Sequence, residues 1–217
     1  MKIVAYEVRE DEAEIMKKLA GKLGIDELVT TAEPLTLDTV HLAEGAAGVT
    51  TLGQSIIDEK VCQALKIIGV KGYSTRTVGY NHVNLKAAAE AGIRVSNATY
   101  SPHGVAEYTV MLILMTLRNY KPALYRINVN DYSLNGLIGK ELHDMTVGII
   151  GTGKIGAAVI QNLSGFGCKL LAHSRHEDEN VKKYAIYVDM DTVYSDCDII
   201  SFRSPLNDAT YHMVNKR

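Results

Sequence analysis

Cysteine, excess charge of either sign and long apolar runs are all scarce in this sequence. Its three cysteines, Cys62, Cys168 and Cys197, are widely spaced and form no Cys-x-x-Cys pair, so we expect neither a disulfide framework nor a zinc site. A net charge of −2 argues against nucleic acid or an anionic membrane as the main partner. No apolar run approaches the roughly 18 residues of a membrane span, and the first residues lack the apolar core of a signal peptide. We therefore expect a cytoplasmic protein with small-molecule partners.

Strands and helices alternate from the first residue, which predicts parallel sheets covered by helices. Up to residue 96 the pattern predicts strands at 2–6, 28–31, 48–51, 70–74 and 93–96, and helices at 11–23, 36–44, 58–66 and 85–91. Within 11–23, Ile15, Leu19 and Leu23 form an apolar stripe at helical spacing. We interpret residues 1–100 as a flavodoxin-like domain and residues 101–217 as a second domain.

A long apolar segment, residues 105–118, follows the boundary. Its apolar residues lie on almost every side of the expected helix, and a helix of that kind is normally buried. We therefore expect it to be buried between the two domains. Residues 121–142 have no clear pattern, although 125–130 are compatible with a helix.

The second domain begins at residue 146 as another βα series. We expect strands at 146–150, 169–173, 186–188 and 198–202, and helices at 154–166 and near 190–194. This is one mononucleotide-binding half of a Rossmann sheet, whereas a dinucleotide domain has two such halves. We therefore expect these residues to belong to a longer architecture, so that the Rossmann domain is incomplete in this chain.

The most informative motif joins the first strand and helix of that series. It reads Gly151-x-Gly153-x-x-Gly156 between an apolar strand and a helix start. In this context the first glycine permits a tight turn, the second lets the backbone approach a pyrophosphate, and the third lets the helix pack closely on the strand. The pattern predicts a dinucleotide site at the start of the helix.

The end of the following strand indicates which dinucleotide. An NAD site usually has Asp or Glu about 20 residues after the glycines to bind the ribose hydroxyls. Here the strand ends in Ser174-Arg175-His176, and the first carboxylates, Glu177 and Asp178, come later. Arginine binds phosphate oxygens through a two-pronged contact, so we favour NADP(H) over NAD(H). The alternative is that these are solvated loop residues that tolerate NAD.

Four segments, in order, resemble the D-isomer-specific 2-hydroxyacid dehydrogenase family, and within it the D-lactate dehydrogenases of the vancomycin-resistance type. They are Arg76-Thr-Val-Gly-Tyr-Asn-His-Val83, Asn97-Ala-Thr-Tyr-Ser-Pro-His-Gly-Val-Ala-Glu107, Met145-Thr-Val-Gly-Ile-Ile-Gly-Thr-Gly-Lys-Ile-Gly156 and Ser204-Pro-Leu-Asn-Asp-Ala-Thr-Tyr-His-Met213. The resemblance implies hydride transfer from a nicotinamide to C2 of a 2-oxo acid, giving the D-2-hydroxy acid.

The resemblance also assigns roles to single residues. Substrate binding falls to Val78 and Gly79, whose backbone N–H groups match a carboxylate-binding loop, and to Tyr100. The residues implied to contact the dinucleotide are Val105, Gly151, Gly153, Lys154, Ile155, Gly156, Ser174, Arg175, Ser204, Pro205 and Thr210. A homodimer is implied as well.

The family's catalytic arginine, carboxylate and histidine come after the segment that matches Ser204–Asn215. We therefore assign no catalytic residue here and expect the chain to be the N-terminal part of a longer enzyme. His103 lies beside Tyr100 in sequence, but we interpret it as a helix-start residue without chemistry. Pyruvate is the favoured substrate. The alternatives are a branched 2-oxo acid such as 2-oxoisocaproate, or a dinucleotide-sensing interaction protein of the corepressor kind.

Overall fold

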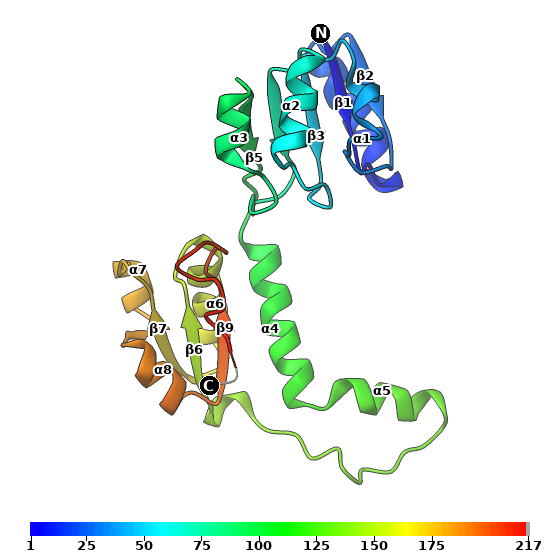
Figure 1. Ribbon diagram of the computed structural model, residues 1–217. Helices are drawn as coiled ribbons and strands as arrows, with labels where there is room; N and C mark the ends of the chain where they lie inside the picture. The colour runs from blue at the N-terminus through cyan, green and yellow to red at the C-terminus, as the bar shows by residue number, and fades with distance from the viewer. Residues whose placement is uncertain (216–217) are drawn as a thin grey trace. The chain divides into compact units, whose positions relative to one another are not determined.

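The computed structural model describes residues 1–215 and divides into two compact units. One unit is Met1–Tyr100, and the other begins at Ser101 (Figure 1). Each unit is built around its own parallel sheet and has its own apolar core. The prediction of an α/β fold with parallel sheets is confirmed. The assignment of substrate binding to the first unit and dinucleotide binding to the second remains a prediction.

The first unit has the strand order of a flavodoxin-like sheet. The order is β2-β1-β3-β4-β5, and every pair is parallel. The strands are β1 (Lys2–Ala5), β2 (Glu27–Thr30), β3 (Gly48–Thr51), β4 (Gly72–Thr75) and β5 (Arg94–Asn97). The order reverses between β1 and β3, so the loops after these two strands meet at the point where folds of this kind bind ligands.

The helices of the first unit are α1 (Glu10–Lys22), α2 (Glu59–Ile67) and α3 (Leu85–Glu90). Side chains of Asp58 and Asn84 cap α2 and α3 by accepting hydrogen bonds from backbone N–H groups. The helix predicted at 36–44 is wrong in length, because only a 3₁₀ turn, η1 (Val40–Ala43), forms. The Thr39 hydroxyl donates to the Pro34 carbonyl and accepts from the Thr36 N–H, which replaces helical bonds with local ones.

The apolar stripe on α1 does not face the core. Ile15, Leu19 and Leu23 are 60%, 48% and 72% exposed. The helix instead turns Ala20 inward, with Met16 half-buried one turn earlier. The stripe therefore predicted the helix but not the side through which it packs.

The second unit carries the parallel sheet β8-β7-β6-β9. Its strands are β6 (Thr146–Ile150), β7 (Lys169–His173), β8 (Ile186–Tyr187) and β9 (Ile199–Phe202). Its helices are α4 (His103–Leu117), α5 (Tyr120–Asn128), α6 (Lys154–Ser164), α7 (Glu179–Lys182) and α8 (Met190–Asp196), with a 3₁₀ turn η2 (Leu142–Asp144). The predicted first Rossmann half is confirmed, and α7 was not predicted.

Within its own unit, α4 buries only part of its apolar surface. It packs along α6 through one face, where Ala106, Val110 and Ile113 are buried. On the other side Tyr108 is 58% exposed and Leu112 is 44% exposed. The second unit thus leaves part of the apolar surface of α4 uncovered, and α5 has no buried residue at all. A location of α4 between the two domains stays a prediction.

Across residues 1–215, every helix is too short or too polar to traverse a bilayer.

Candidate functional sites

The turn between β6 and α6 requires two of its glycines for packing alone. Gly151 has a φ of +95°, and a Cβ there would lie 2.8 Å from the carbonyl carbon of Arg203. A Cβ at Gly156 would lie 2.0 Å from the Gly151 carbonyl oxygen. Both positions therefore exclude every other residue type, whether or not a ligand binds.

Gly153 differs, because among residues 1–215 the space beside its Cα is open. A Cβ at this position would meet no atom within 4 Å. Gly153 is also the N-cap of α6, and no side chain caps that helix. By contrast, the Asp189 side chain caps α8 by accepting from the Thr192 N–H. Open space in front of an uncapped helix start is what a phosphate group requires.

A cavity of about 390 Å³ opens at this turn, at the carboxyl ends of β6, β7 and β9. It is lined by Ile150, Gly151, Thr152, Gly153, His173, Ser174, Arg175, His176, Met190, Arg203, Ser204, Pro205, Asn207, Ala209, Thr210 and Met213. Cationic and hydrogen-bonding groups thus surround a glycine turn, and this combination fits a phosphorylated ligand.

The structure brings together seven of the residues implied to contact a dinucleotide, all in the lining of this cavity: Gly151, Gly153, Ser174, Arg175, Ser204, Pro205 and Thr210. The other four lie outside the lining. Gly156 is a packing residue, Ile155 is half-buried against the core, and Lys154 is exposed at the helix start. Val105 is on the first turn of α4, where its carbonyl accepts from the Thr109 hydroxyl.

Arg203 is the main lining residue that the motifs did not indicate. It directly follows β9, its Nε donates to the Ser201 hydroxyl at 3.1 Å, and burial lowers its pKa. The rule that ligands bind beyond the carboxyl ends of parallel strands would have selected it. The Thr210 hydroxyl donates to the Pro205 carbonyl, so this side chain closes its own loop.

The tip of β7 presents its cation without a nearby free carboxylate. Arg175 is exposed, and among residues 1–215 its side chain has no hydrogen bond or ion pair. Glu177 forms an ion pair with Lys182 at 2.8 Å, and the Asp178 side chain accepts from the Asn180 N–H at 2.8 Å. The two carboxylates closest in sequence to the tip are therefore committed to α7 and its surroundings.

In the first unit, the loop after β4 carries Val78 and Gly79. Its carbonyl groups are held, because the Thr77 hydroxyl donates to the Gly79 carbonyl at 2.7 Å and the Asn97 amide donates to the Val78 carbonyl at 2.8 Å. Within the described part of the chain, the N–H groups of Val78 and Gly79 have no partner. Tyr100, 53% exposed, ends this unit.

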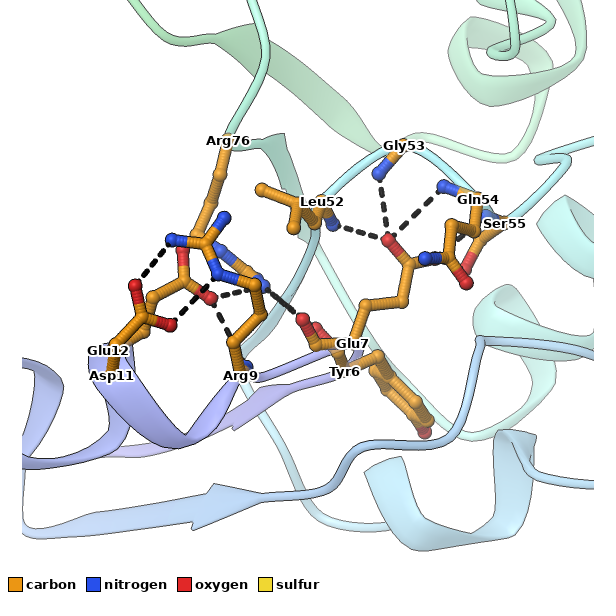
Figure 2. Close-up of polar contacts among 10 residues, drawn as sticks. All are labelled: Tyr6, Glu7, Arg9, Asp11, Glu12, Leu52, Gly53, Gln54, Ser55 and Arg76. Atoms are coloured by element: carbon orange, nitrogen blue, oxygen red, sulfur yellow. Dashed lines mark hydrogen bonds and ion pairs between the residues drawn. The ribbon is translucent and has the colours of Figure 1, made fainter. Parts of the chain in front are cut away.

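A buried carboxylate at the switch point between β1 and β3 was missed by the sequence reasoning. Glu7 is 4% exposed and lies two residues after the end of β1 at Ala5 (Figure 2). One of its oxygens accepts from the N–H groups of Leu52, Gly53 and Gln54, and the other accepts from the N–H and hydroxyl of Ser55. No local pattern announces these partners, since they are 45 or more positions away in the chain.

The electrostatics of Glu7 follow from these contacts. Burial of the carboxyl acts to raise its pKa, but the hydrogen bonds from Ser55, Gln54 and Leu52 outweigh burial and hold the pKa below its ordinary value of 4.5. Glu7 is therefore ionised at neutral pH. Burial lowers the pKa of the nearby His82, whose ring lies 3.5 Å from the Tyr73 hydroxyl.

The fold defines an α/β protein of two parallel-sheet units, the second of which has a cavity at its glycine turn. Residues 110–217 match the family described as D-isomer specific 2-hydroxyacid dehydrogenase, NAD binding domain. The chain belongs to the D-isomer specific 2-hydroxyacid dehydrogenase family, because nearly all of it also matches a solved member of which it covers more than two thirds. That member is the apo structure of D-lactate dehydrogenase from Escherichia coli, with a TM-score of 0.87 and 33% identity over 99% of this chain and 70% of the other.

Two relatives with known names agree with this membership. An aromatic 2-oxoacid reductase of Clostridium sporogenes is 41% identical over 100% of this chain and 66% of its own length. A D-specific alpha-keto acid dehydrogenase of Enterococcus faecium is 38% identical over 98% of this chain and 65% of its own length. The chain thus spans about two thirds of the length of these relatives.

Proposed function

We propose that this chain carries the dinucleotide site and the substrate-carboxylate loop of an enzyme that reduces a 2-oxo acid to the D-2-hydroxy acid. The observation that supports it most is the open glycine turn at Gly153, with an uncapped helix start beside a cavity that contains Arg175 and Arg203. When bound, the dinucleotide supplies the hydride. The N–H groups of Val78 and Gly79 are free to hold the substrate carboxylate, because a loop of this kind can direct consecutive N–H groups at an anion.

We further propose that the dinucleotide is NADP(H). The support is the exposed guanidinium of Arg175, beside Ser174 and His176, together with the engagement of Glu177 by Lys182. A carboxylate that is paired with a lysine is less available to accept hydrogen bonds from the ribose hydroxyls of NAD(H). The proposal predicts that Arg175→Ala lowers the affinity ratio of NADPH to NADH by roughly tenfold or more, the effect of one charge-assisted hydrogen bond.

The matched control is Lys183→Ala. It removes one positive charge close in sequence, from an exposed residue that does not line the cavity. Fluorescence titration of each variant with NADPH and NADH measures the ratio directly. A ratio that is the same in Arg175→Ala and in wild type would refute the preference for NADP(H).

Pyruvate remains our favoured substrate, giving D-lactate. An aromatic 2-oxo acid is a second candidate, because the relative from Clostridium sporogenes is named an aromatic 2-oxoacid reductase. Steady-state reduction of pyruvate, 2-oxoisocaproate and phenylpyruvate by the full-length natural protein decides among them through kcat/KM. A protein that binds NADPH tightly but reduces none of the three would instead fit a dinucleotide-sensing interaction protein.

We propose that the protein works as a homodimer. Exposed apolar side chains are concentrated on α4, on α5 and on the segment that follows, among them Tyr108, Leu112, Tyr125 and Leu134. Sedimentation velocity should give twice the mass of one chain, and Tyr125→Asp should shift the protein towards the monomer. A monomer at micromolar concentration in the wild type would refute this assembly.

A further inference from the structure

Glu7 adopts a backbone conformation that a glutamate rarely takes. Its φ is +56°, in the left-handed region, and its N–H donates to the Glu33 carbonyl at 3.0 Å. A strained residue of this kind persists only where its surroundings fix it, and such residues gather at functional sites. In this conformation the Glu7 side chain points towards the loop after β3 (Figure 2).

The carboxylate of Glu7 fills that loop. The N–H groups of Leu52 and Gly53 donate to its Oε2 at 2.6 and 2.7 Å, and the Ser55 N–H donates to its Oε1 at 2.6 Å. Consecutive N–H groups that converge on one point make an anion site. Here the anion comes from the chain itself, so the loop is held in one shape by an internal carboxylate.

The main chain of Glu7 reaches a second loop. Nη2 of Arg76 donates to the carbonyl of Tyr6 at 3.0 Å and to the carbonyl of Glu7 at 2.9 Å (Figure 2). The same guanidinium lies 3.6 Å from Glu12. Arg76 directly follows β4 and begins the run that leads to Val78 and Gly79.

The loop filled by Glu7 also lies close to that run. Gly53 has a φ of +123°, and a Cβ there would lie 3.2 Å from the Thr77 methyl group. The Thr77 hydroxyl in turn donates to the Gly79 carbonyl at 2.7 Å. Two routes therefore lead from Glu7 to the Val78–Gly79 loop, one through its side chain and Gly53, the other through its carbonyl and Arg76.

We propose that Glu7 is a positioning residue for substrate binding: by fixing the Leu52–Ser55 loop and Arg76, it fixes the Val78–Gly79 loop that receives the substrate carboxylate. This inference rests on the proposed function of that loop. Glu7 does not itself contact the substrate. Its effect should fall on recognition of the 2-oxo acid and should leave recognition of the dinucleotide unchanged, since the cavity at Gly153 belongs to the other unit.

The test uses Glu7→Gln and Glu7→Gly in the full-length natural protein. Glutamine keeps the shape of the side chain. Both carboxylate oxygens of Glu7 accept from N–H groups, so in either orientation the glutamine NH2 group, which is a donor, faces another donor. Glycine removes the carboxylate but adopts a positive φ without strain. This second variant therefore keeps the test informative if Glu7→Gln fails to fold. The control is Glu10→Gln, the same charge change at an exposed residue of α1.

Two quantities are measured: the KM values for pyruvate and for NADPH, and the methyl resonances of Thr77 and Val78. We expect both Glu7 variants to raise the KM for pyruvate by roughly tenfold, as for a displaced binding group, to leave the KM for NADPH unchanged, and to shift both methyl resonances. Glu10→Gln should change none of these. An unchanged KM for pyruvate, unshifted methyl resonances, or a loss of folding in both variants would each overturn the proposal.

Failure of the proposed function has a different signature. In that case the wild-type protein reduces none of the 2-oxo acids, and the methyl resonances alone decide whether Glu7 positions the loop. Shifted resonances at Thr77 and Val78 would then keep the positioning role, and unshifted ones would overturn it.

Discussion

The loop after β3 and the loop after β6 present backbone N–H groups in the same way but use them differently. In the first unit, Leu52–Ser55 surrounds the carboxylate of Glu7, so its N–H groups are satisfied within the protein. In the second unit, Gly153 faces open space and the α6 start has no side-chain cap. Both loops lie beyond the carboxyl ends of parallel strands, where such folds bind ligands. Whether the protein supplies its own anion decides which of the two loops is open to a ligand.

Holding the Leu52–Ser55 loop, called the closed loop below, requires backbone strain at Glu7. A non-glycine residue in the left-handed region costs about 1–3 kcal/mol, and Glu7 occupies that region. The hydrogen bonds of an ionised group contribute about 1.5–3 kcal/mol each, and Glu7 accepts several of them in a buried setting. The contacts therefore outweigh the strain, whereas the open loop keeps its N–H groups for a ligand.

The largest effect is expected from Gly156→Ala. The new Cβ would lie 2.0 Å from the Gly151 carbonyl oxygen, a backbone atom that cannot move aside as a flexible side chain could. We expect the second unit to lose about 3 kcal/mol or more of stability, and to lose dinucleotide binding with it. Thermal unfolding followed by circular dichroism measures this. A melting temperature equal to that of wild type would contradict the packing role of Gly156.

Gly153→Ala separates packing from binding. The added methyl group meets no protein atom within 4 Å, so the fold should be kept with a loss of at most about 1 kcal/mol at a helix N-cap. The methyl group occupies the space where a pyrophosphate would approach, and NADPH affinity should fall at least tenfold, which corresponds to about 1.4 kcal/mol. Isothermal titration calorimetry gives the affinity. An unchanged Kd together with an unchanged fold would show that the open space is not a binding site.

Acid should weaken the closed loop selectively. Because the folded-state pKa of Glu7 lies below its ordinary value of 4.5, its stabilisation is fully present above pH 4.5 and is lost as pH falls through the lowered folded-state value. Asp11 and Asp189 also have lowered pKa values, so the wild type alone does not isolate Glu7. Urea unfolding should show that the wild type has a higher free energy of unfolding than Glu7→Gln, and that this difference becomes smaller below pH 4.5. A difference that stays constant with pH would contradict the account.

The smallest effect is expected at a helix that has its own cap. The Asn84 side chain accepts from the Ala87 N–H at 3.0 Å, so α3 has no free N-terminus of the α6 kind. Asn84→Ala should cost about 1 kcal/mol and should leave NADPH affinity unchanged. Chemical unfolding and the NADPH titration together check this, and a change in NADPH affinity would contradict the assignment of binding to the open turn.

Local patterns predicted most of the fold, because alternating βα units and glycines act over short stretches of chain. The Gly151, Gly153 and Gly156 series predicted both the turn and the cavity beside it. The side of α1 that faces the sheet was not predictable from Ile15, Leu19 and Leu23, since helical spacing gives a stripe but not its partner. Glu7 was missed for a related reason. Its partners at 52–55 are set by the order of β1 and β3 in the sheet, which no local stretch encodes.

The most direct test of the contrast between the two loops is an amide chemical-shift map of the chain during titration with NADPH. The account predicts that the N–H resonances of Gly151, Gly153 and Lys154 move with increasing NADPH, while those of Leu52–Ser55 stay in place because Glu7 already occupies that loop. Movement at Leu52–Ser55 without movement at Gly153 would contradict it.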